Sequence, residues 1–159
     1  MSSTEIIQKH TERWTASQQD RTRQYVPEKY QLGILVDFLD ELGVRYATEK
    51  SIFSYPIDLL CVNRDETMAI EMKSRNIGKG IDQALRNSDY VDYSFLAIWE
   101  EDLSDSLIKR VSDLPIGLMA IDGSVNIVSG PQKSGQQLYS NARVVELVGG
   151  NVRKHDTIQ

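Results

Sequence analysis

Three ionisable side chains, those of Asp58, Glu71 and Lys73, stand in two apolar segments that would otherwise be typical of buried strands. The segments, 55–62 and 68–75, are separated by five polar residues, and this arrangement predicts a β-hairpin. Because side chains alternate along a strand, Glu71 and Lys73 are expected on one face, about 7 Å apart. A charge in a buried strand is costly unless it is paired or binds a metal ion, so these residues indicate a chemical site.

The chemistry available to this trio is that of phosphate cleavage. Asp58 and Glu71, brought side by side across the hairpin, would offer two carboxylates to Mg²⁺, which prefers hard oxygen ligands and keeps several waters. Lys73 would orient the attacking water or stabilise charge that develops on a phosphate. A structural interpretation stays open, in which Asp58 caps the strand and the other two form a solvated ion pair of little energetic consequence.

The order Pro56-x-Asp58, twelve intervening residues and Glu71-x-Lys73 resembles the signature of the PD-(D/E)XK, or restriction-endonuclease-like, nuclease superfamily. The first half departs slightly, because one residue separates the proline from the aspartate. The resemblance implies a metal site formed by Asp58, Glu71 and the backbone carbonyl of Met72. The metal would be Mg²⁺, for which Mn²⁺ can substitute, and Lys73 would position the attacking water.

Two further residues are candidates through the same resemblance. Nucleases of this superfamily commonly place a glutamine in the helix after Glu-x-Lys, so Gln83 would orient Lys73 or the water. The chain departs from the subgroup with a tyrosine four residues later, where it has Asn87. Glu28, at the start of an earlier helix, would supply an additional acid, but a glutamate in a first helical turn is also simply favourable to the helix dipole, and we prefer this second interpretation.

The elements that must position these residues alternate between helix and strand. Apolar periodicity, an opening Pro27 and a closing Gly43 predict a helix over 27–42. A three-strand meander is expected next, over 44–54, 55–62 and 68–75. It is followed by a helix over 81–91, a strand over 94–99, a helix over 103–111 and two strands over 116–121 and 125–128. This order is similar to the superfamily's αβββαβ core. We therefore expect an α/β fold (α+β, with a mixed sheet) of restriction-endonuclease-like type, with an extra N-terminal helix and C-terminal edge elements.

The ends of the chain lie outside that resemblance, which covers 28–128. We expect a helical arm over 1–26, a single domain over 27–148 and a flexible tail over 149–159. Trp14 in the arm either packs on the domain or stacks on a nucleic acid, and the first is preferred. Segment 137–148 is expected to form an edge strand or a short helix.

Composition excludes several classes of function. One cysteine and two histidines, which lie near opposite ends, provide no disulfide framework, zinc site or histidine-based triad. No apolar segment is long enough for a membrane span and no signal peptide is evident, so we expect a cytoplasmic protein without a membrane partner. No glycine-rich phosphate loop follows a strand, which disfavours a small-molecule-binding α/β domain.

The net charge of −5 argues mildly against a general nucleic-acid binder, but the basic residues are clustered. Arg75, Lys79 and Arg86 follow Lys73 closely, where a phosphate-binding rim would be required. We expect a Mg²⁺-dependent nuclease that acts on DNA, or alternatively on RNA, and that by analogy forms a homodimer. The alternative is a non-catalytic nucleic-acid-binding or assembly subunit that retains the nuclease fold.

Overall fold

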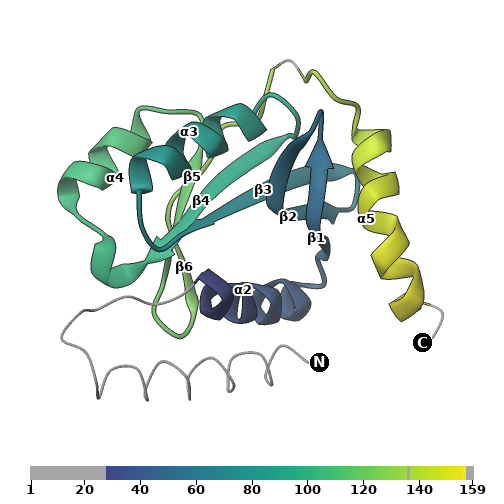
Figure 1. Cartoon of the computed structure of the whole chain (residues 1–159), viewed down its shortest axis with the longest axis horizontal. Coiled ribbons are helices and arrows are strands. Elements are labelled where there is room, and N and C mark those ends of the chain that lie inside the picture. The colour runs from purple at the N-terminus through teal and green to yellow at the C-terminus, as the bar shows by residue number, and fades with distance from the viewer. Residues whose placement is uncertain (1–27, 136, 157–159) are drawn as a thin grey trace.

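A six-stranded mixed sheet, in the order β1-β2-β3-β4-β5-β6, forms the centre of the molecule (Figure 1). The computed structural model describes residues 28–135 and 137–156, so the expected arm over 1–26 lies outside the described residues. Neighbouring strands are antiparallel except for the β3–β4 and β4–β5 pairs, which are parallel. The strands span Arg45–Ile52, Tyr55–Asn63, Glu66–Lys73, Tyr93–Trp99, Gly117–Ile121 and Val125–Ser129. The mixed α/β architecture confirms the predicted fold class, whereas the nuclease identity of the core stays a prediction.

Helices cover both faces of the sheet. Helix α2 (Glu28–Leu42) packs on one face, over alternate strand residues such as Leu59 and Ile70. The opposite face carries α3 (Ile77–Asn87), α4 (Asp105–Ser112) and α5 (Asn141–Asp156), while a short 3₁₀ turn, η1 (Glu100–Asp102), follows β4. The strand residues beneath α3, α4 and α5 include Leu60, Ala69 and Leu96. Successive residues of β2 and β3 thus enter different cores, which is the period-2 pattern of a sheet buried on both sides.

Helix α3 begins earlier and ends earlier than its sequence pattern predicts. Its first turn starts at Ile77, after Asn76 adopts a left-handed conformation with φ of 53°. Residues 77–80, which precede the predicted start of this helix at 81, are therefore helical, because two glycines weaken the helical pattern without preventing the helix. The helix ends at Asn87, and turns lead from there to β4.

Segment 137–148 contributes to a helix rather than an edge strand. Helix α5 begins at Asn141 and places Val144 and Val148 in the core beside β1 and β2. It continues through Gly149 and Gly150 to Asp156, so the boundary expected at 149 is not an end of regular structure. Among the helices of the described part of the chain, none is both long and apolar enough to cross a lipid bilayer.

Candidate active site

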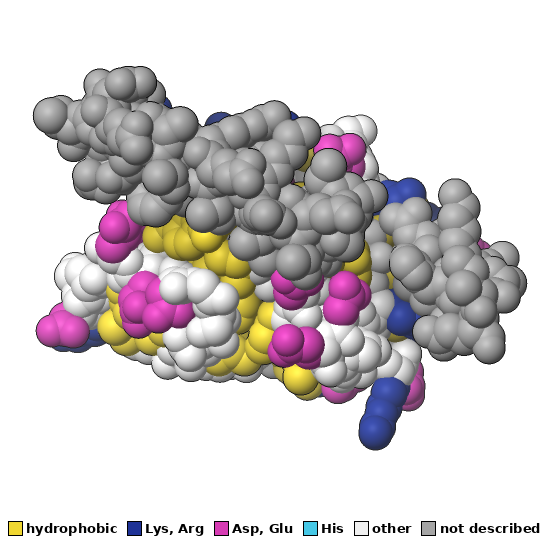
Figure 2. All heavy atoms as spheres, turned by 90° about the horizontal axis from the view of Figure 1, so that it is seen from below, with side chains coloured by type: hydrophobic (Ala, Val, Ile, Leu, Met, Phe, Trp, Pro, Cys, Tyr) yellow, Lys and Arg dark blue, Asp and Glu magenta, His cyan; other side chains and the backbone are white. Residues whose placement is uncertain are grey.

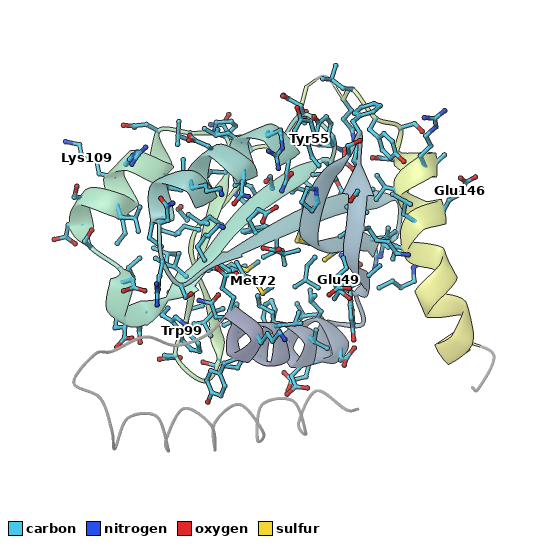
Figure 3. The ribbon with its side chains drawn as sticks, viewed as in Figure 1. Glu49, Tyr55, Met72, Trp99, Lys109 and Glu146 are labelled. Atoms are coloured by element: carbon cyan, nitrogen blue, oxygen red, sulfur yellow. The ribbon has the colours of Figure 1, made fainter. Side chains whose placement is uncertain are left out.

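The structure brings Asp58 against Glu71, whose side chain lies on the face of the sheet that α3 covers. The β2–β3 ladder pairs Leu59 with Ile70, and one further step of this register sets Asp58 opposite Glu71. The Asp58 carboxylate accepts a hydrogen bond of 2.9 Å from the backbone N–H of Met72. Asp58 is half-buried, and Glu71 is only 2% exposed. Met72 itself points to the opposite core, toward α2 (Figure 3).

Burial and the neighbouring carboxylate hold Glu71 in its neutral form. Desolvation, a hydrogen bond with Asp58 and the negative charge of Asp58 together raise the pKa of Glu71 to about 8. A hydrogen bond of 3.0 Å from the Asn87 side-chain amide and the positive charge of Lys73 act in the opposite direction. At neutral pH the pair therefore shares a proton, because two carboxylates in contact cannot both ionise cheaply.

Lys73 is the last residue of β3, and packing from two helices fixes its place. Its aliphatic stem lies against Gly80 of α3, where an added Cβ would collide with Lys73 Cγ and lie 2.9 Å from Leu96 Cδ1. From the other face, the Gln31 amide of α2 donates a 3.0 Å hydrogen bond to the Lys73 carbonyl. The backbone of Lys73 is therefore held in place, and its side chain lies on the same face of β3 as that of Glu71, two residues earlier.

Helix α3 presents a polar stripe to the carboxylate pair. Gly80, Gln83 and Asn87 follow one another at spacings of three and four, so they share one helical face. Gln83 Oε1 and Asn87 Oδ1 are buried without a hydrogen-bond partner, as is Gln31 Oε1 on α2. Such oxygens are costly when left unsatisfied, and they are the groups that a bound cation, water or substrate donor would satisfy.

Glu28 lies beside the site rather than inside it. A pocket of about 420 Å³ is lined by Glu28, Glu49, Asp58 and Met72 among others, so Glu28 and Asp58 face one cavity. Across residues 28–135 and 137–156, no group of three or more Asp, Glu, His or Cys side chains gathers closely enough to hold a metal ion. Glu28 therefore does not complete a three-ligand cluster with Asp58 and Glu71.

Three residues of this region were not found from the sequence. Gln31 on α2 contacts Lys73 and Asn87 on α3 contacts Glu71, and the only signal for either in the sequence is a polar residue within a buried helical face. Glu49 stands opposite Asp58, since Thr48 and Lys50 pair on either side of it, and its φ of 56° is left-handed. Such a conformation is uncommon for glutamate, and no sequence signal predicts it.

The basic residues expected around the site differ in exposure. Arg75 and Lys79 are exposed at the start of α3, where a phosphate backbone could reach them. Arg86 is half-buried, and its guanidinium lies 4.2 Å from the centre of the Tyr55 ring. Its charge is thus placed at the edge of the site by an aromatic side chain, not on an open surface.

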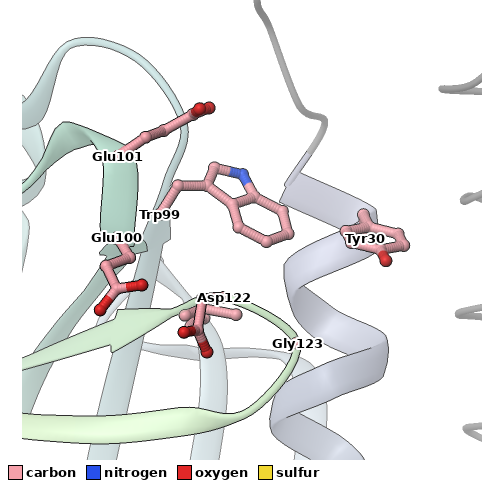
Figure 4. A pocket seen from close by; sticks show the side chains of 7 residues that line it. Tyr30, Trp99, Glu100, Glu101, Asp122 and Gly123 are labelled. Carbon is pink, nitrogen blue, oxygen red and sulfur yellow. The ribbon is translucent and has the colours of Figure 1, made fainter.

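A second pocket lies at the carboxyl ends of β4 and β5 (Figure 4). It measures about 300 Å³, and the Tyr30 and Trp99 rings stack 5.2 Å apart in its wall. Exposed acidic groups surround these rings, and a hydrogen bond with Asp122 raises the pKa of Glu100. No basic side chain lines the described walls, so this pocket would repel a phosphate.

The donor set around Asp58 and Glu71 fits a hard divalent cation. The two carboxylates are in contact and share a proton that a cation can replace. The Met72 N–H points toward β2, and since N–H and C=O of one strand residue point to the same side, its carbonyl does too. Two carboxylates and one carbonyl leave positions for water and a phosphate oxygen, as Mg²⁺ sites commonly do.

Comparison with known proteins adds a fold but no activity. No family model matches the chain, and no curated protein matches it. Among solved structures, the chain is similar to a protein of unknown function from Silicibacter pomeroyi, with a TM-score of 0.57 and 16% identity. The similarity covers 74% of this chain and 80% of that chain. At this identity it shows a shared fold alone.

Proposed function

We propose that this protein is a divalent-cation-dependent nuclease that hydrolyses phosphodiester bonds of DNA. The observation that carries the proposal is the contact between the buried Glu71 and the half-buried Asp58, with Lys73 on the same strand face as Glu71. A carboxyl group with a strongly raised pKa, such as that of Glu71, beside a lysine is typical of catalytic sites. A solvated surface ion pair, the structural alternative, requires exposed groups, whereas Glu71 is buried.

Each side chain then has a defined task. Asp58, Glu71 and the Met72 carbonyl would hold Mg²⁺ or Mn²⁺, which supplies Lewis-acid stabilisation of the phosphate. Lys73 holds the attacking water and counters the charge that develops on the phosphate. Gln83 orients Lys73 or the water through its unsatisfied Oε1, and Asn87 fixes the Glu71 carboxyl. Glu28 is a candidate additional acid because it lines the cavity that Asp58 enters.

The charge distribution supports binding of the substrate on the α3 side of the sheet. Arg75 and Lys79 are exposed there, beside the end of β3. Figure 2 shows the α2 side, where acidic side chains are spread over the visible surface between apolar patches. The rim formed by Arg75 and Lys79 would attract a phosphate backbone.

A non-catalytic nucleic-acid-binding subunit is the second candidate. One observation favours it: within the described residues only two carboxylates meet at the site, and no third Asp, Glu, His or Cys side chain joins them. In that case Asp58 and Glu71 would have a structural role only, and the protein would have the fold of a nuclease without its activity.

The deciding experiment incubates the purified full chain with supercoiled plasmid, linear duplex, single-stranded and branched DNA, and RNA, each with Mg²⁺, Mn²⁺ or EDTA. The nuclease proposal predicts cleavage with a divalent cation, none in EDTA, and none by Glu71→Gln. Binding of nucleic acid without cleavage of any substrate would favour the second candidate. Cleavage that persists at the wild-type rate in Glu71→Gln would assign the activity to a contaminant or to another site.

A further inference from the structure

The tip of the β1–β2 hairpin displays an aromatic residue in a strained conformation. Strands β1 and β2 are joined by Phe53 and Ser54 alone, with Ile52 paired to Tyr55. Both turn residues have positive φ, 51° and 70°, which tight two-residue hairpin turns normally obtain from Asn-Gly. A positive φ is rare for a bulky residue because it strains the backbone. Such backbone strain often occurs at functional sites. Phe53 is also 55% exposed.

Phe53 belongs to a cluster of four aromatic rings, Phe53, Tyr55, Tyr90 and Tyr139, that we call the aromatic cluster. The Phe53 ring meets those of Tyr90 and Tyr139 edge to face, with centroids 5.6 and 5.4 Å apart. Tyr55 stacks on Tyr90 at 6.4 Å. Tyr90 is buried and Tyr139 is half-buried, so they support the two outer residues, Phe53 and Tyr55, which are 55% and 43% exposed. The exposed rings therefore form a fixed platform.

Positive charge flanks this platform. The Arg86 guanidinium lies over Tyr55 at 4.2 Å, and that of Arg143 lies 5.8 Å from the centre of the Tyr139 ring. Arg86 Nε and Nη2 are buried without a hydrogen-bond partner, so only the rest of this half-buried guanidinium can face a ligand, and Arg86 forms none of the ion pairs found in the described part of the chain. Asp89, next to Tyr90, is the opposing charge. Two guanidinium groups beside stacked rings match a ligand that carries both aromatic faces and phosphates.

The aromatic cluster is connected to the candidate active site. Tyr55 precedes Asp58 by three residues on β2, about 10 Å along the strand. Arg86, which contacts Tyr55, is adjacent in α3 to Asn87, which donates to Glu71. Figure 3 shows Tyr55 at the end of the hairpin, beside the C-terminal part of α3. A chain that stacks on the cluster would thus extend toward Asp58 and Glu71.

We propose that the aromatic cluster stacks unpaired bases, so that the substrate class of this site is single-stranded nucleic acid or an unpaired end. The inference rests on the proposed function, because it names the substrate of that same site. Bases within a duplex are stacked on one another and cannot offer their faces to Phe53 and Tyr55, whereas every unpaired base can. A duplex would contact the basic residues only.

The test measures binding of the full chain, in EDTA so that no cleavage occurs, to fluorescein-labelled 20-nucleotide oligothymidine, oligouridine and a 20-base-pair duplex. Single strands should bind more tightly than the duplex, with the two arms showing whether DNA or RNA is preferred. Phe53→Ala should weaken single-strand binding about tenfold and leave duplex binding unchanged. Ile127→Ala removes a side chain of equal exposure, 55%, on β6 and should change neither.

A second variant separates stacking from folding. Asparagine suits the positive φ better than alanine and loses the same ring contacts, so Phe53→Asn should melt at a higher temperature than Phe53→Ala while it weakens single-strand binding as strongly. Equal losses for single strand and duplex, or no loss in either Phe53 variant, would overturn the proposal, as would failure of wild type to bind any oligonucleotide. Single-strand binding that depends on Phe53 without cleavage in Mg²⁺ or Mn²⁺ would defeat the nuclease function but not the platform.

Discussion

A cluster of polar side chains around a buried carboxyl group lies near each end of β3. The two clusters differ in how completely the protein satisfies the hydrogen-bonding groups of their side chains. Near its start, Asp92 is 4% exposed and accepts hydrogen bonds from the Thr67 backbone N–H and the Asn141 amide, at 3.0 and 2.9 Å. The Thr67 hydroxyl in turn donates to Asn141. Near its end, Glu71 is as deeply buried, yet it must share a proton with Asp58.

The unsatisfied polar atoms gather at one of these two places. Apart from that of Ser129, the buried side-chain atoms without a partner in the described part of the chain belong to Gln31, to Ser74, and to Gln83, Arg86 and Asn87 of α3. Gln31 and Asn87 contact Lys73 and Glu71, and Ser74 directly follows Lys73. None belongs to the Thr67, Asp92 and Asn141 cluster among the described residues. Buried polar groups whose hydrogen bonds are all made within the protein stabilise the packing of its elements. Buried polar groups that lack a partner indicate a place where a ligand can supply it. We therefore interpret the first cluster as structural and the second as functional.

The largest expected effect is on cleavage by Lys73→Ala. Loss of a positive group that stabilises the developing charge should lower kcat about 100-fold or more, with little change in the free energy of unfolding. The rate is measured on the best substrate of the nuclease panel, with Lys109→Ala, an exposed lysine on α4, as the control. A variant that cleaves at the wild-type rate would reduce Lys73 to a structural residue.

The opposite outcome is expected at the other cluster. Asp92→Ala leaves the Thr67 N–H and the Asn141 amide without their acceptor, so urea unfolding should show a loss of about 1–3 kcal/mol. The folded fraction should keep wild-type kcat. If Asp92→Ala were as stable as wild type but inactive, the assignment of structural and functional roles to the two clusters would be reversed.

The pH dependence of the free energy of unfolding should report on the Glu71 carboxyl. Folding raises the pKa of Glu71 from 4.5 to about 8, so between these values the folded state holds a proton that the unfolded state has lost. Stability in EDTA is thus fully supported below the lower value and falls as pH rises toward the upper one. Glu71→Gln, which cannot titrate, should flatten this fall in urea unfolding across that range. An equally steep fall in Glu71→Gln would show that another group causes it.

The smallest expected effect comes from two matched glycines of α3. A Cβ at Gly80 would collide with Lys73, whereas one at Gly78 meets nothing within 4 Å. Gly80→Ala should therefore lower kcat several-fold by displacing the flexible lysine stem. Gly78→Ala should leave kcat unchanged and raise stability by about 0.5–1 kcal/mol. Equal kcat in both variants would show that the position of Lys73 is not set by this contact.

The sequence predicts the hairpin and the pairing of Asp58 with Glu71 because both follow from local rules, the period of a strand and the length of a polar break. It does not predict Gln31 or Asn87 as partners, because their contacts depend on how two helices pack on opposite faces of the sheet. The start of α3 was missed for a related reason: Gly78 and Gly80 weaken the helical pattern, yet Gly80 is needed for close contact with Lys73. The shifted pKa of Glu71 depends on burial, which only the assembled fold determines.

The central claim is that Asp58 and Glu71 form a divalent-cation site. The most direct test compares the melting temperatures of wild type and Asp58→Asn, each measured in EDTA and in saturating Mg²⁺ or Mn²⁺. A cation that binds only the folded state at about one hundred times its Kd stabilises by about 2.7 kcal/mol, a rise of a few degrees for a domain of this size. Wild type should show this rise, and Asp58→Asn should not, while in EDTA the variant should be at least as stable because Glu71 no longer faces a negative charge. The same melting temperature with and without cation in both proteins would contradict the account.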